Sequence, residues 1–171
     1  MRIAVVALGK IGLPLAVQYA DKGHEVIGVD VNPAVVEAVN AGTEPFPGEA
    51  HLAEKLAALS PATGNGALRA TTDYAEAIPQ ADAIVLVVPL FVNDETWEPD
   101  FDWMDAATKS LAAHLTPDTV ISYETTLPVG TTCNRWKPMI EEISGLTEGQ
   151  DFHLVFSPER VLTGRVFADL R

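Results

Sequence analysis

The sequence predicts a doubly wound α/β fold, in which helices cover both faces of a parallel sheet. Short aliphatic runs alternate along the chain with segments of helical periodicity, as strands and crossover helices do in such folds. The run over 83–88 is almost entirely aliphatic, which is typical of a strand buried on both faces of a parallel sheet. With 171 residues and 47% hydrophobic content, the chain can form one domain with a substantial core.

The first twelve residues predict a strand, a tight turn and the start of a helix. A branched apolar run over 1–6 is followed by Gly9 and Gly12, and Ala7 replaces the first glycine of a G-x-G-x-x-G pattern. Such a turn lets a pyrophosphate approach the main chain at a helix N-terminus, whose free N–H groups attract an anion. A methyl group at this position is expected to be tolerated if Ala7 keeps a negative φ. The pattern therefore predicts a Rossmann-like dinucleotide-binding unit.

The phosphate contacts are assigned to the residues of the turn. They are Gly9, Lys10, Ile11 and Gly12. The side chain of Lys10 either stays in solvent or approaches the pyrophosphate, and its main-chain N–H is a phosphate contact in both cases.

A carboxylate after the second strand predicts the identity of the cofactor. The aliphatic run over 26–29 ends in Asp30, which lies 21 positions after Gly9. A carboxylate about 20 residues after the glycine turn accepts hydrogen bonds from the ribose hydroxyls and repels a 2′-phosphate. Asp30 could instead cap the next helix, but Asn32 and Pro33 already supply a cap and a first-turn proline. We therefore predict NAD as the cofactor and Asp30 as its ribose ligand.

The remaining elements continue the alternation of strand and helix. Further helices are expected over about 33–41, 51–59, 73–78 (capped by Asp73), 102–115 and 131–143. Further strands are expected over 68–70, 83–88, 119–123 and 153–156. Between them, residues 91–102 form a polar, aromatic, proline-bearing segment with the composition of a functional loop.

Composition excludes several classes of function. A formal net charge of −13 argues against nucleic-acid and anionic-membrane partners, because both are polyanions. Cys133 is the single cysteine, which excludes an internal disulfide and fits a reducing compartment. The four histidines share no metal-ligand spacing, so we expect no metal site. Lys10, two glycines and Pro14 interrupt the N-terminal apolar run before it reaches signal-peptide length, and we expect a cytoplasmic protein.

Three motifs follow three of the predicted strands. They are Gly-Lys-Ile-Gly-Leu-Pro at 9–14, Glu-Thr-Thr-Leu-Pro-Val-Gly-Thr at 124–131 and Ser-Pro-Glu-Arg-Val at 157–161. In this order they resemble the UDP-glucose/GDP-mannose dehydrogenase family, over the whole chain but only over the N-terminal domain of the family's enzymes. The resemblance implies an NAD-binding domain of a nucleotide-sugar 6-dehydrogenase. Such enzymes oxidise the C6 alcohol to a carboxylate with two NAD in successive steps.

The resemblance also implies roles for individual residues. Thr126 falls on the threonine that positions the water which hydrolyses a thioester intermediate. Glu159 falls on an acid near cofactor and substrate that acts as a base or orients water. We count both as catalytic and cofactor-contacting. Pro89, in Val-Pro-Leu where the family has threonine-proline, is expected beside the cofactor. The family's nucleophilic cysteine and its lysine would lie beyond Arg171, and Cys133 does not match the cysteine motif.

Two acidic residues and one arginine lie near this predicted reaction centre. Glu124 and Glu159 are expected at the ends of adjacent inner strands, with a solvated or capping role favoured for Glu124. Arg160 could pair with Glu159 or bind a substrate carboxylate or phosphate through its planar fork, and we favour substrate binding.

The resemblance finally bears on domains and substrate. Residues 1–171 are expected to be the N-terminal part of a longer, homodimeric enzyme, without its central helix and UDP-sugar-binding domain and inactive alone. The Ser-Pro-Glu-Arg-Val motif, with Thr163 where the UDP-glucose branch has an acid, favours the branch that acts on UDP-N-acetylmannosamine over UDP-glucose. Two alternatives are a dehydrogenase of the 3-hydroxyacid or 6-phosphogluconate type and a non-catalytic dinucleotide-sensing module.

Overall fold

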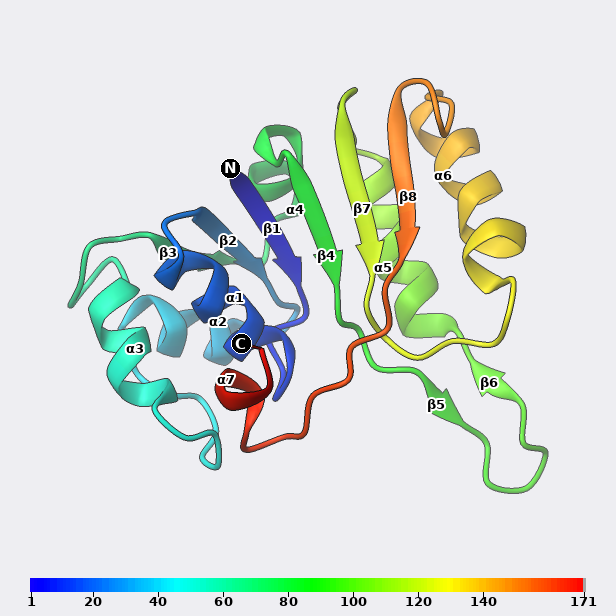
Figure 1. The fold of residues 1–171 in the computed structure, drawn as a ribbon. Helices are drawn as coiled ribbons and strands as arrows, with labels where there is room; N and C mark the ends of the chain where they lie inside the picture. The colour runs from blue at the N-terminus through cyan, green and yellow to red at the C-terminus, as the bar shows by residue number, and fades with distance from the viewer. Residues whose placement is uncertain (171) are drawn as a thin grey trace.

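The computed structural model describes residues 1–170 and confirms the doubly wound parallel sheet (Figure 1). Its strands are β1 (Arg2–Val6), β2 (Glu25–Val29), β3 (Leu68–Thr71), β4 (Ala83–Leu86), β7 (Thr119–Tyr123) and β8 (Phe152–Phe156). All neighbours are parallel, in the order β3-β2-β1-β4-β7-β8. The chain starts at β1, moves out to β3, and then crosses back to β4. The order therefore reverses between β1 and β4, and doubly wound sheets bind ligands at the carboxyl ends of the strands beside such a point.

Alternating side chains of β1 divide the core between the two faces of the sheet. Ile3 and Val5 belong to one buried apolar cluster, whereas Ala4 and Val6 belong to the other. The first cluster also takes side chains from α1 (Gly12–Asp21), α2 (Pro33–Asn40) and α3 (Leu52–Leu59). The second takes side chains from α4 (Tyr74–Ala77), α5 (Asp102–Ala112) and α6 (Lys137–Ser144). Burial on both faces explains why the inner strands are so apolar.

Two predicted helix caps are present. The side chain of Asn32 accepts a hydrogen bond from the N–H of Ala34 at 3.0 Å, with Pro33 as the first residue of α2. Asp73 accepts one from the N–H of Ala75 at 2.8 Å and so begins α4, which a short 3₁₀ helix (Ile78–Gln80) extends. Each cap satisfies an N–H group that has no partner within its own helix.

Three segments differ from the sequence-based expectation. The 91–102 segment forms an antiparallel hairpin of β5 (Phe91–Val92) and β6 (Pro99–Asp100), which projects from the carboxyl side of the sheet (Figure 1). The helix expected over 131–143 begins as a π-helix (Thr132–Trp136) before α6, where Pro138 has no N–H for a regular helical hydrogen bond. A short helix, α7 (Val166–Asp169), was not expected. Within residues 1–170, no helix is long and apolar enough to cross a membrane.

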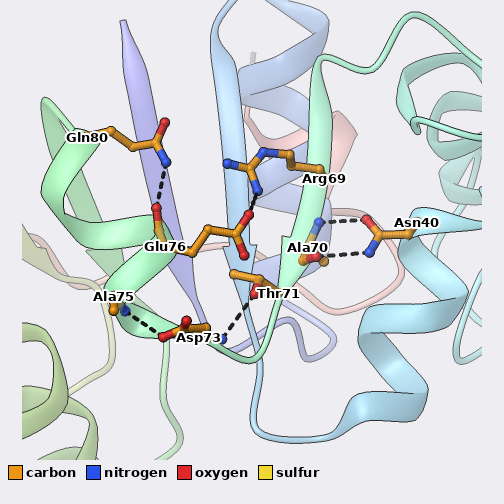
Figure 2. A network of polar contacts seen from close by, with 8 residues as sticks. All are labelled: Asn40, Arg69, Ala70, Thr71, Asp73, Ala75, Glu76 and Gln80. Atoms are coloured by element: carbon orange, nitrogen blue, oxygen red, sulfur yellow. Dashed lines mark hydrogen bonds and ion pairs between the residues drawn. The ribbon is translucent and has the colours of Figure 1, made fainter.

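The outer edge of β3 is covered by a side-chain amide (Figure 2). Asn40 donates from Nδ2 to the carbonyl oxygen of Ala70 at 2.9 Å, and its Oδ1 accepts from the N–H of Ala70 at 2.8 Å. The amide thus satisfies the two backbone groups that a further strand would otherwise pair. Beside it, Arg69 forms an ion pair with Glu76, which links β3 to α4.

Replacing Asn40 by alanine is expected to lower the free energy of unfolding by about 1–3 kcal/mol, because two partly buried backbone groups lose their partners. Thermal and urea denaturation would measure the loss. Glu37→Ala, at an exposed position of the same helix, is the control and should change stability by less than about 0.5 kcal/mol. Equal stability of the two variants would show that the edge amide contributes nothing.

Candidate cofactor site

The turn between β1 and α1 forms the centre of the site. The N–H of Leu13 donates to the carbonyl oxygen of Gly9 at 3.0 Å as the helix begins. A Cβ at Gly12 would lie 1.9 Å from the carbonyl oxygen of Ala7, so only glycine fits there. A Cβ at Gly9, by contrast, would have no described protein atom within 4 Å. Packing therefore does not require a glycine at position 9. The absence of a side chain at Gly9 leaves the main chain of the turn open to a ligand.

Ala7 does not meet the condition of a negative φ on which its tolerance depends. Its φ is +73°, in the left-handed region that normally favours glycine. The N–H of Ala7 donates to the carbonyl oxygen of Val29 at 2.8 Å, and its own carbonyl oxygen packs against Gly12. These contacts hold the peptide groups on both sides of Ala7, so the chain adopts the glycine conformation although a methyl group is present. For a residue with a Cβ this conformation costs about 1–2 kcal/mol.

Ala7→Gly is therefore expected to stabilise the protein. Relief of the left-handed strain outweighs the greater entropy of glycine in the unfolded chain, for a net gain of about 0.5–1 kcal/mol and a Tm increase of about 1–4 °C. Differential scanning calorimetry would measure the change. Ala58→Gly, at an exposed site in α3, should lower Tm instead, and a decrease for both variants would contradict the strain at Ala7.

Asp30 is fixed at the carboxyl end of β2. Its Oδ2 accepts from the N–H of Leu8 at 2.8 Å, and its Oδ1 accepts from the N–H of Asn32 at 2.9 Å. The carboxylate therefore connects the glycine turn to the start of α2, and it is Asn32 that caps that helix. Each carboxylate oxygen keeps capacity for a further hydrogen bond. Burial, together with the nearby charge of Asp30, raises the pKa of Tyr74 to about 12, so the phenol beside Asp30 stays protonated at neutral pH.

A pocket of about 380 Å³ opens beside Asp30 at the point where the strand order reverses. It is lined by the ends of β1 and β2, by the loop after β4, by Tyr74 of α4 and by one side of α5 from Trp103 to Ser110. Three of the residues predicted to bind the cofactor, Gly9, Asp30 and Pro89, line this one pocket. Most of its other walls are apolar, which is typical of a pocket for a small organic ligand.

A second group of polar side chains lies at the ends of β7 and β8. The N–H of Glu159 donates to the carbonyl oxygen of Glu124 at 2.9 Å, which brings the loop after β8 against the end of β7. The hydroxyl of Ser122 donates to Glu124 Oε1 at 2.9 Å. Partial burial and the negative charge of Glu159 raise the pKa of Glu124, against the opposing effect of the Ser122 hydrogen bond. The two carboxylates are therefore close enough to influence each other.

Comparison with known proteins identifies the family. The model of the NAD binding domain of the UDP-glucose/GDP-mannose dehydrogenase family matches residues 1–171. The chain belongs to this family. It is 32% identical over 172 residues to UDP-N-acetyl-D-mannosamine dehydrogenase of Pyrococcus horikoshii, and 35% identical over 177 residues to the enzyme of that name from Escherichia coli K12. These alignments cover 99% and 98% of this chain, but only 39% of each relative.

Solved structures of family members have the same fold. GDP-mannose dehydrogenase from Pseudomonas aeruginosa superposes with a TM-score of 0.91 at 26% identity, over 99% of this chain and 38% of that one. UDP-D-ManNAc dehydrogenase from Pyrococcus horikoshii superposes with a TM-score of 0.89 at 30% identity, over 99% and 39%. The resemblance predicted from the three motifs is thus confirmed, and the chain spans about two-fifths of the length of these relatives.

The family motifs after β7 and β8 take different positions at the site. Thr126 is exposed on the loop after β7, whereas the hydroxyl of Thr125 donates to the carbonyl oxygen of Val88 at 2.7 Å and ties this loop to the one after β4. Glu159 Oε2 accepts from the N–H of Val161 at 2.8 Å and so braces its own loop. The expectation that Glu159 follows an inner strand is wrong, because β8 is the edge strand and only Glu124 follows an inner one.

The two basic residues predicted for the dehydrogenase site are both exposed. Arg160 forms no ion pair with Glu159 or with any other residue in 1–170, so the structure gives the pairing alternative no support. Lys10 is exposed on the glycine turn. Cys133 is exposed in the π-helix.

Sequence reasoning missed two aromatic residues of the pocket. Tyr74 and Trp103 occupy the first turns of α4 and α5, and both line it. The sequence pattern that could have identified them is an aromatic residue in the first turn of a helix that follows a strand. The polar, aromatic composition of residues 91–102 indicated a functional segment that ends just before Trp103, but nothing in it indicated Tyr74.

Proposed function

We propose that this chain binds NAD as the cofactor domain of a nucleotide-sugar 6-dehydrogenase. The observation that carries the proposal is the 2.8 Å hydrogen bond from the N–H of Leu8 to Asp30, which joins the glycine turn and the carboxylate at one pocket. The residues present fit the cofactor. Gly9 leaves the main chain accessible, and the helix dipole of α1 begins at the same turn. When bound, NAD supplies a hydride acceptor for the substrate alcohol.

The proposed contacts divide between the two halves of the site. The turn formed by Gly9, Lys10, Ile11 and Gly12 would hold the pyrophosphate through its N–H groups. Asp30 would accept hydrogen bonds from the adenosine ribose, with Pro89 beside it. Thr126 and Glu159, at the ends of β7 and β8, would act on the reacting side, where Arg160 would bind the substrate.

The proposed substrate is a UDP-sugar of the UDP-N-acetylmannosamine type. The curated relatives given above carry that substrate in their names, and the Ser-Pro-Glu-Arg-Val motif favours the same branch. We propose that residues 1–171 correspond to the N-terminal part of such an enzyme, and that the remaining part supplies the nucleophilic cysteine, the lysine and most of the sugar-binding surface. A homodimer is the proposed assembly of that complete enzyme.

Asp30→Ala is expected to weaken NAD binding by about 1.5–3 kcal/mol, because a carboxylate that bonds the ribose hydroxyls is lost. The unchanged chain should bind NAD more tightly than NADP, since Asp30 repels a 2′-phosphate. Isothermal titration calorimetry with both cofactors would measure the affinities. Asp94→Ala, at an exposed position of the hairpin, is the charge-matched control.

Two results would contradict this proposal. Equal affinity for NAD and NADP would show that Asp30 does not bind the adenosine ribose. A loss of affinity that follows a loss of Tm would mean that Asp30 acts only by bracing the turn. Asp30→Asn keeps one acceptor oxygen but lacks the charge, and it should bind NADP more tightly relative to NAD than the unchanged chain does.

A further inference from the structure

Two large aromatic side chains at the mouth of the pocket are only partly covered by the protein. Trp103 is 60% exposed and Phe91 is 52% exposed. Their ring centroids lie 5.1 Å apart at an interplanar angle of 87°, an edge-to-face arrangement. Phe91 belongs to β5, where it pairs with Asp100 of β6, so the hairpin holds Phe91 against the indole. Trp103 therefore has a defined position without being buried.

The position of Trp103 relative to Asp30 indicates which part of a ligand could contact the indole. Both side chains line the same pocket, together with apolar groups that include Val29, Val88 and Ala107. A nucleotide whose ribose is held by Asp30 must place its base within a few ångströms of that sugar, inside the same pocket. The polar groups there are few, and the hydroxyl of Ser110 already donates to the carbonyl oxygen of Ala106. A base in this pocket would therefore meet mainly apolar and aromatic surfaces and few hydrogen-bonding partners.

We propose that the indole of Trp103, held in place by Phe91, is the surface on which the adenine of the dinucleotide stacks. This inference rests on the proposed NAD site and assigns a residue to its base. It also gives the β5–β6 hairpin a role, as the support that fixes Trp103 at the pocket. Every base has a π-face, and stacking on an aromatic side chain needs no hydrogen bond to the base edge.

The test compares two exposed tryptophans. Trp103→Ala should weaken both NAD and AMP by the same factor, about 10- to 100-fold, because the two ligands share the adenine. Trp103→Phe keeps a π-face and should stay within about threefold of the unchanged chain. Trp97→Ala is the matched control, since Trp97 is 80% exposed at the hairpin turn and does not line the pocket, and it should change neither affinity. Phe91→Ala should give an intermediate loss.

Fluorescence supplies a second readout. Stacked adenine should quench tryptophan emission when AMP is added, and this quenching should persist in Trp97→Phe but disappear in Trp103→Phe. Unchanged NAD affinity in Trp103→Ala, with Asp30→Ala still weakening NAD, would overturn the stacking assignment while the NAD site stands. A loss of NAD affinity without a loss of AMP affinity would also overturn it. If the unchanged chain binds no NAD, the proposed function itself fails, and the inference fails with it.

Discussion

Alanine at Gly12 is expected to prevent the native turn from forming, whereas alanine at Gly9 should leave the fold intact and remove most of the NAD affinity. At Gly12 the added Cβ would meet the carbonyl oxygen of Ala7 at 1.9 Å, and this oxygen belongs to the main chain of the turn. Overpacking usually costs about 1–3 kcal/mol, and a clash with main chain should cost at least the upper end of that range. At Gly9 the Cβ meets no described protein atom within 4 Å, so stability should not change.

The expected effect at Gly9 concerns the ligand alone. A methyl group there would stand between the main chain and an approaching pyrophosphate. Displacing one charge-assisted hydrogen bond costs about 1.5–3 kcal/mol, or about tenfold or more in NAD affinity. Circular dichroism and urea denaturation would establish folding, and calorimetric titration would establish affinity. A Gly9→Ala variant that binds NAD as tightly as the unchanged chain would show that the pyrophosphate does not pass over this turn.

The elements that could be predicted from the sequence are those encoded by neighbouring residues. The aliphatic run of β4 and the caps at Asn32 and Asp73 depend on local periodicity or on a side chain that bonds two residues ahead, and all are present. The β5–β6 hairpin was missed because its strands have two residues each, too few for a periodic pattern. A regular α-helix was expected where the π-helix lies, because helical periodicity does not show how the hydrogen bonds rearrange in the turn before Pro138.

The features that could not be predicted depend on contacts between distant parts of the chain. The φ of Ala7 is held by a hydrogen bond to Val29, on a neighbouring strand. The edge position of β8 follows from the order of all six strands. Trp103 reaches the pocket only because α5 packs beside the ends of β1 and β4. Asp30 could be predicted only in part. Its spacing from Gly9 identified the residue, but the hydrogen bond that it accepts from the N–H of Leu8 could not be inferred from that spacing.

In the complete enzyme to which we assign this chain, replacing Glu159 or Thr126 by alanine should lower turnover about 10²- to 10⁴-fold, the usual range for general acid–base assistance. If both residues serve the water step implied by the family resemblance, cofactor binding should change much less than turnover. The thioester adduct between enzyme and substrate should then accumulate. Steady-state kinetics and intact-protein mass spectrometry would measure the two effects.

Conservative variants separate this chemical role from a structural one. Glu159 Oε2 already accepts a hydrogen bond from the N–H of Val161, so its loss could simply loosen the loop after β8. Glu159→Gln keeps an oxygen for that hydrogen bond but cannot accept a proton, and it should retain the native Tm while losing turnover. Thr126→Ser keeps the hydroxyl and should retain most of the activity. If Glu159→Gln turns over at nearly the native rate while Glu159→Ala only lowers Tm, Glu159 braces the loop and is not catalytic.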